Sequence, residues 1–237
     1  MTESTQRPSH HRIALAAHVL PFFAWIAVMS LLGEPAGWKY AVRTFVCLAL
    51  LLGLRPWRWY GPLRLRHVPA AVGVGALVFV VWVAGETELA ARWPWFQHVY
   101  RMLNTMPPWK APELTTTSVY APEVCGWGLT VLRLLGSACV ISFIEEFFWR
   151  GFVYRWFIHQ DFLSVDPGRM QRPVFWLVAV AFGLEHSQWM AGLAAGAAFG
   201  WLMIRTRDIW AAGVAHAVAN LLLGIYVIVT GKYQFWS

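Results

Sequence analysis

Two adjacent carboxylates stand in the stretch ISFIEEFFWRGFVYRW (residues 141–156), which is otherwise almost entirely apolar and aromatic. An ionisable side chain at the centre of a bilayer costs at least about 2.5–3.5 kcal/mol, so each one needs a partner or a task. On a helix, Glu146 and Arg150 share a face four residues apart, in the order that favours an ion pair. Glu145 lies about 100° around the helix from Glu146. It is the carboxylate that this ion pair leaves free.

Polar residues at similar depth occur in two later apolar segments: His186 in FGLEH, and His216 with Asn220 in HAVAN. If the helix of Glu145 continues to His159, Glu145 lies about 15 Å from the cytoplasmic end of that helix. His186 lies about 20 Å, and His216 about 10 Å, from the cytoplasmic ends of their own helices. A single His or Asn in a membrane helix is most simply an interhelical hydrogen bond. Taken together with an unpaired carboxylate, they predict a functional site.

The chemistry that suits these residue types is amide hydrolysis. A carboxylate and an imidazole in a desolvated pocket can take a proton from water, which then attacks a carbonyl. The remaining His and Asn can donate hydrogen bonds to the resulting oxyanion. The chain contains neither a G-x-S-x-G elbow nor an H-E-x-x-H motif, so a serine triad and a zincin site are both unsupported.

The elements that must position these residues are membrane helices. The 237 residues are 58% hydrophobic and 13% charged, which excludes an ordinary soluble domain. We predict an all-α, polytopic membrane protein, a bundle of about seven transmembrane helices with an intramembrane cleft. The predicted spans are 13–33, 39–54, 68–84, 124–148, 173–190, 191–205 and 209–230.

The arginines predict the orientation of these spans. Under the positive-inside rule, the segment before the first span and the loop after the second are cytoplasmic, and the N-terminus is inside. The net charge of +7 does not indicate nucleic acid, because the basic residues stand at the ends of apolar runs. The cytoplasmic arginines are Arg7, Arg12, Arg55, Arg58, Arg64, Arg66, Arg155, Arg169, Arg172, Arg205 and Arg207. Arg133, near the outer end of its span, is expected to snorkel.

The longest loop, 85–123, is predicted to be external and to rest its aromatic side chains at the membrane interface. These are Trp93, Trp95, Tyr100 and Trp109. We divide the chain into N-terminal helices with this loop (1–123) and a catalytic core (124–237). In the core, Gly192, Gly196 and Gly200 form a double G-x-x-x-G face that should hold the helices of His186 and His216 together.

Three motifs in this core carry a family resemblance. EEFFWR at 145–150 matches E-E-x-x-x-R, FGLEH at 182–186 matches F-x-x-x-H, and HAVAN at 216–220 matches H-x-x-x-N. The chain resembles the CPBP family of intramembrane proteases, which includes type II CAAX prenyl endopeptidases and bacteriocin-processing or immunity proteins. The resemblance covers roughly 124–230. The size and the Trp-rich loop look similar to CAAX protease-related proteins of bacteria that use exosortase sorting.

The resemblance implies a role for each motif position. Glu145, with His186, would position and activate the water, and His216 and Asn220 would stabilise the oxyanion. Glu146, Arg150 and Phe182 would support them. We predict no cofactor, because Asn is a poor zinc ligand and a Glu–His pair can activate water unaided. Zinc held by Glu145, His186 and His216 is the alternative.

The resemblance also implies a glutamic-type endopeptidase that cleaves a membrane-bound protein or peptide, including prenylated CAAX-like substrates. Its location would be the plasma (inner) membrane of a bacterium, where the partners are the substrate and the lipid bilayer. A non-catalytic peptide-binding or bacteriocin-immunity protein is the alternative. A proton-coupled transporter is disfavoured, because the sequence shows neither inverted repeats nor broken helices.

Overall fold

The computed structural model describes residues 6–104 and 118–236, and this part of the chain is helical without any strand. The α-helices are α1 (Gln6–Leu32), α2 (Gly37–Leu54), α3 (Val68–Val83), α4 (Glu88–Ala91), α5 (Pro94–Asn104), α6 (Pro122–Cys125), α7 (Trp127–Gly136), α8 (Ser142–Glu146), α9 (Tyr154–Ile158), α10 (Arg172–Leu184), α11 (Trp189–Thr206) and α12 (Ile209–Thr230). Short 3₁₀ turns are η1 (Pro56–Trp59), η2 (Leu65–His67), η3 (Ala84–Glu86), η6 (Phe162–Ser164) and η7 (Tyr233–Trp236). The all-α prediction is confirmed.

Five helical segments of the described chain are long and apolar enough to cross a membrane. They are His11–Leu32, Gly37–Trp59, Leu65–Ala91, Trp127–Ile158 and Ile209–Thr230. α10 is apolar but has only 13 residues, and α11, with 18 residues, is not among the five. The chain is therefore an integral membrane protein, while the predicted total of about seven spans stays a prediction.

The helix that carries both carboxylates runs without a break from Trp127 to Ile158. Its continuation past Arg150, which the apolar sequence predicts, is confirmed. Gly126, with a φ of 82°, separates α6 from α7, so the span begins a few residues later than the predicted 124. Two π-helical segments interrupt the α-helix, η4 (Ser137–Ile141) before α8 and η5 (Phe147–Val153) after it. Such segments widen a helix locally and are frequent at functional sites.

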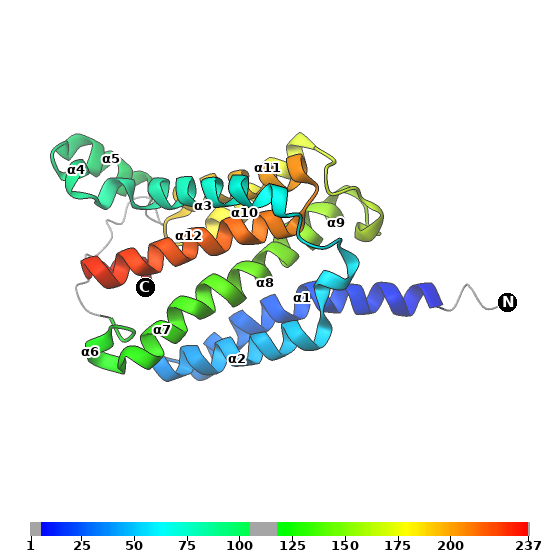
Figure 1. Ribbon diagram of the computed structural model, residues 1–237, viewed down its shortest axis with the longest axis horizontal. Helices are drawn as coiled ribbons and strands as arrows, with labels where there is room; N and C mark the ends of the chain where they lie inside the picture. The colour runs from blue at the N-terminus through cyan, green and yellow to red at the C-terminus, as the bar shows by residue number, and fades with distance from the viewer. Residues whose placement is uncertain (1–5, 105–117, 237) are drawn as a thin grey trace.

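The helices form two groups with the carboxylate helix between them (Figure 1). On one side α3 packs along α12, and α10 packs along α11; on the other side α1 packs along α2. The central helix joins the groups, because α7 contacts α2 and α8 contacts α12. α4, α5 and α6 lie at one end of the bundle and α9 at the opposite end. The predicted division of the chain at residue 123 stays a prediction, and both parts contribute to this bundle.

The glycine face of α11 packs on α10. A Cβ at Gly196 would meet the backbone of Ala179 at 3.0 Å, and one at Gly192 would meet Gly183 at the same distance. Glycine at both positions lets the two backbones come this close without a shift. The expected contact with the helix that precedes His186 is therefore present, whereas α12 is reached through other side chains of α11, such as Phe199, whose ring stacks on His216.

Part of the predicted external loop packs on the bundle. The Tyr100 hydroxyl on α5 donates to the carbonyls of Val81 (2.9 Å) and Trp82 (2.5 Å), and Arg101 makes two hydrogen bonds of 2.7 Å with Glu86. Burial, with the nearby Glu86 carboxylate, raises the pKa of Tyr100, so its hydroxyl remains a donor. Trp93 and Trp95 are exposed, as interfacial anchors would be. Trp109 lies outside the described residues, and the interfacial role of the loop stays a prediction.

The orientation in the membrane can be tested with reporter fusions. A reporter fused after Arg66 is expected to report the cytoplasm, and one fused after Lys110 the exterior, because the first loop is rich in arginine and the second is acidic. Alkaline phosphatase and green fluorescent protein fusions give opposite signals on the two sides. Reversed signals would contradict the predicted cytoplasmic N-terminus and the depths counted from it.

Candidate active site

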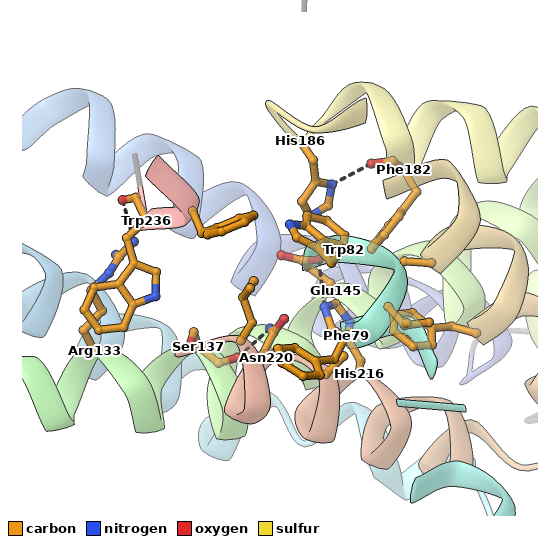
Figure 2. Close-up of a pocket in the computed structure, with 16 residues that line it drawn as sticks. Phe79, Trp82, Arg133, Ser137, Glu145, Phe182, His186, His216, Asn220 and Trp236 are labelled. Atoms are coloured by element: carbon orange, nitrogen blue, oxygen red, sulfur yellow. Dashed lines mark hydrogen bonds and ion pairs between the residues drawn. The ribbon is translucent and has the colours of Figure 1, made fainter. Parts of the chain in front are cut away.

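All four residues predicted to do chemistry line one pocket of about 160 Å³. Glu145 comes from α8, His186 from the turn after α10, and His216 and Asn220 from α12. Figure 2 shows them converging from these separate segments. α3 of the N-terminal half adds apolar side chains that the sequence gave no reason to choose: Val78, Phe79 and Trp82.

Glu145 is buried, with 7% of the residue exposed. Its Oε2 atom has no hydrogen-bond partner among the described residues and lies 3.8 Å from His216 Nε2. A buried oxygen without a donor is costly unless something else binds it. The carboxylate that the sequence identified as free therefore keeps an unused acceptor at the pocket.

His216 lies between the two carboxylates. Its Nδ1 is 3.0 Å from Glu146 Oε1, and its Nε2 faces Glu145. The ring stacks on Phe199 with centroids 4.8 Å apart. With a proton on Nδ1 donated to Glu146, the neutral ring presents Nε2 to the pocket as an acceptor. The sequence paired His216 with Asn220 and did not reveal that it also joins Glu145 to Glu146.

The predicted ion pair between Glu146 and Arg150 is confirmed, with 3.0 Å between Oε1 and Nη1. Both residues are almost completely buried, at 1% and 2% exposure. Arg150 also donates from Nη2 to the Gly196 carbonyl at 3.0 Å, and its guanidinium lies 4.3 Å from the Phe182 ring centre. Arg150 thus joins the carboxylate helix to α11 and to the end of α10.

The His186 ring is oriented by a hydrogen bond to the backbone of Phe182, four residues earlier. Its Nδ1 lies 2.8 Å from the Phe182 carbonyl, which fixes the proton on Nδ1 and leaves Nε2 as an acceptor. The Phe182 and Trp82 rings pack on it, with centroids at 4.8 and 5.3 Å. The neighbouring Glu185 instead accepts a hydrogen bond from Trp149 Nε1 (2.9 Å) and does not line the pocket.

Asn220 donates from Nδ2 to the Ser137 carbonyl at 3.1 Å. That carbonyl belongs to the first π-helical segment, η4, where the helix is locally widened. One amide N–H of Asn220 is used by this bond and the second N–H is left for another acceptor. The bond orients the side chain at the middle of the pocket, between Ser137 and the His216 ring (Figure 2).

Arg133 also lines this pocket, which the sequence analysis did not predict. Its guanidinium lies 3.9 Å from the Tyr120 ring centre and 4.5 Å from that of Tyr40. Nη2 donates to the Trp236 carbonyl at 2.8 Å. Arg133 lies at the end of the pocket opposite Glu145, a position that depends on the packing of α7 against α2 and η7.

A catalytic zinc ion requires three protein ligands around one point. Within residues 6–104 and 118–236, no group of three His, Cys, Asp or Glu side chains is arranged to hold a metal ion. The Nδ1 atoms of His186 and His216 are both engaged by protein oxygens. Each ring still presents Nε2 to the pocket, and a zinc-ligating histidine commonly donates its other N–H to a protein oxygen in this way, so zinc held by Glu145, His186 and His216 stays the alternative to a metal-free site.

The fold and the site together define a class: a helical membrane protein in which a buried Glu, two His and an Asn surround one pocket. Residues 127–222, less than half of the chain, match the family described as type II CAAX prenyl endopeptidase Rce1-like. The matched segment contains Glu145, His186, His216 and Asn220. No curated protein and no solved structure matches the chain.

Proposed function

We propose that the protein is an intramembrane endopeptidase that hydrolyses a peptide bond of a membrane-associated, prenylated CAAX-like substrate with a Glu/His-activated water. One observation carries the proposal: the unpartnered Oε2 of Glu145 shares a pocket with His186, His216 and Asn220, inside the segment that matches the CAAX protease family. From the resemblance we also propose the inner membrane of a bacterium as the location, and from the distribution of arginines a cytoplasmic N-terminus.

The attacking water is held by two acceptors. Glu145 Oε2 and His186 Nε2 both face the pocket without a donor of their own, so one water can donate a hydrogen bond to each. Its lone pair then points away from both, toward a substrate carbonyl. Glu145 takes the proton as the new C–O bond forms, in the manner of a general base.

The tetrahedral oxyanion needs donors on the opposite side of the carbonyl. Asn220 supplies its second amide N–H, since the first is bound to Ser137. His216 can supply a second donor once its Nε2, an acceptor in the neutral ring, has taken up a proton from solvent, while Nδ1–H stays on Glu146. When the C–N bond breaks, the proton held by Glu145 passes to the departing amine. The products are a carboxylate and a free amine.

The pocket walls suit a substrate with an apolar group. The lining apart from the polar residues is almost wholly aliphatic or aromatic, as in many small-molecule pockets. It includes Val78, Phe79, Trp82, Phe182, Phe199, Leu223 and Phe235. We propose that part of this surface receives the apolar portion of the substrate, its prenyl group or the side chains next to the reacting bond.

Hydrolysis can be tested directly with the purified protein in detergent. The wild-type protein is expected to cleave a short farnesylated CAAX-like peptide at one bond, and in H₂¹⁸O the new C-terminus should gain one ¹⁸O atom by mass spectrometry. If the protein binds a panel of such peptides without cutting any of them, the proposed activity is wrong and a non-catalytic peptide-binding protein takes its place.

The metal-free mechanism makes a separate prediction. Chelation at neutral pH is expected to leave the activity in place, and elemental analysis of the purified protein should find no stoichiometric zinc. A zinc-dependent enzyme loses activity on chelation, because the ligands hold the metal only reversibly. Loss of activity with EDTA and recovery on adding zinc would contradict the proposal and assign the ion to Glu145, His186 and His216.

A further inference from the structure

Arg133 occupies the end of the pocket opposite Glu145. Figure 2 shows Arg133 with Trp236 at one end, Ser137 and Asn220 in the middle, and Glu145 with the two histidines at the other end. The guanidinium lies in an aromatic frame made by Tyr40, Tyr120 and Trp236, at 4.5, 3.9 and 5.0 Å from their ring centres. This frame holds a cation at the pocket wall.

The positive charge of Arg133 has no acidic partner in the described part of the chain. Arg150 and Arg101 pair with Glu146 and Glu86, whereas no described carboxylate lies within 4.0 Å of the Arg133 guanidinium. Its one hydrogen bond to a described residue is that from Nη2 to the Trp236 carbonyl, and Nε is buried without a partner. A guanidinium has five N–H donors. Arg133 is half-buried, and the N–H donors that face the pocket without a described partner suit the site to bind an anion.

The distance between the two ends of the pocket fits a peptide. Arg133 and Glu145 belong to one continuous helix and are twelve residues apart, which corresponds to roughly 18 Å along the axis. An extended chain advances about 3.3 Å per residue and covers this length in about five residues. A peptide along the pocket would thus reach Arg133 a few residues after the reacting bond.

We propose that Arg133 binds the C-terminal carboxylate of a peptide whose reacting bond lies at Glu145. A carboxylate matches the planar fork of a guanidinium. The protein would therefore select substrates by a free C-terminus and reject the same sequence in the interior of a chain. The inference rests on the proposed peptidase function and adds a specificity-determining residue to it.

The test measures binding, so that it does not depend on turnover. Fluorescently labelled, farnesylated CAAX-like peptides are prepared with a free C-terminal carboxylate or with a carboxamide, and are titrated into the purified Glu145→Gln protein. We expect the acid to bind about 10- to 100-fold more tightly than the amide, as for a charge-assisted hydrogen bond. In Glu145→Gln with Arg133→Gln this preference should disappear, and with Arg133→Lys it should persist in part.

Arg43 provides the matched control. Its guanidinium also lies over aromatic rings, 3.5 Å from the Trp25 centre and 4.9 Å from the Tyr40 centre, but it does not line the pocket. Glu145→Gln with Arg43→Gln is expected to keep the preference for the acid, even if the melting temperature falls. A loss of preference in both arginine variants would indicate general destabilisation and would overturn the inference.

The remaining outcomes separate the inference from the proposed activity. Equal affinity for acid and amide in the Glu145→Gln protein, no binding of the acid, or an unchanged preference in Arg133→Gln would each overturn the role of Arg133. A clear preference for the acid, combined with no cleavage by the wild-type protein, would support the carboxylate site and refute the peptidase activity. Cleavage of both peptides at equal rates would support the activity and refute the carboxylate site.

Discussion

The Glu145→Gln variant is expected to hydrolyse peptide about 10²- to 10⁴-fold more slowly than the wild-type protein, the loss typical of a removed general base. Gln has nearly the shape of Glu and retains an oxygen acceptor, but it cannot take a proton from water. Within the described part of the chain Oε2 of this carboxylate makes no hydrogen bond, so the fold should lose little. The rate is measured from product formation by mass spectrometry, and folding from the melting temperature in detergent.

Glu185→Gln is the control for this substitution. Glu185 bonds to Trp149 and lies outside the pocket, so its neutralisation should leave most of the activity. An active Glu145→Gln protein would contradict the assignment of Glu145 as the base. A large fall in melting temperature would instead show that the Glu145 carboxylate supports the fold.

Glu146→Gln is expected to reduce both stability and activity. It removes the charge that compensates Arg150 and weakens the acceptor that orients His216. Breaking a buried ion pair by removing one partner costs about 3–5 kcal/mol, and Gln should reach at most this range because it keeps one acceptor oxygen. The melting temperature and the cleavage rate should therefore fall together, in contrast to Glu145→Gln.

The double variant Glu146→Gln with Arg150→Met separates the two effects. It removes the uncompensated cation, so it should regain part of the melting temperature but not the activity, because His216 still lacks a carboxylate on Nδ1. A Glu146→Gln protein that is inactive but as stable as the wild type, together with an active Glu145→Gln protein, would reverse the assigned roles of the two carboxylates.

Local spacing was sufficient to predict several features of the site. The i,i+4 rule predicted the ion pair between Glu146 and Arg150, and it left Glu145 as the carboxylate without a cation. Counting 1.5 Å per residue from the helix ends placed His186 and His216 at the depth of Glu145, and the pocket contains all three. These arguments need only the rise and rotation within one helix.

Features that depend on how helices face one another could not be predicted. The contact of His216 Nδ1 with Glu146 requires the rotation of α12 relative to α8, for which the sequence has no signal. The aromatic frame of Arg133 likewise combines Tyr40 from α2 with Trp236 from η7, far apart in the chain. Glu145 and Glu146 also lie between two π-helical segments, which no residue pattern in the sequence predicts.

Those two π-helical segments divide the central helix into three α-helical pieces, and the rotation of each piece about the helix axis is set separately. Each π turn holds about one more residue than an α turn, which shifts the angular phase of everything after it by about 100°. α8, with its two carboxylates, is thus aimed separately from α7, which carries Arg133, and from α9, which carries Arg155. A one-residue deletion in one π-helical segment, combined with a one-residue insertion in the other, would therefore rotate the carboxylates while both ends of the helix keep their neighbours.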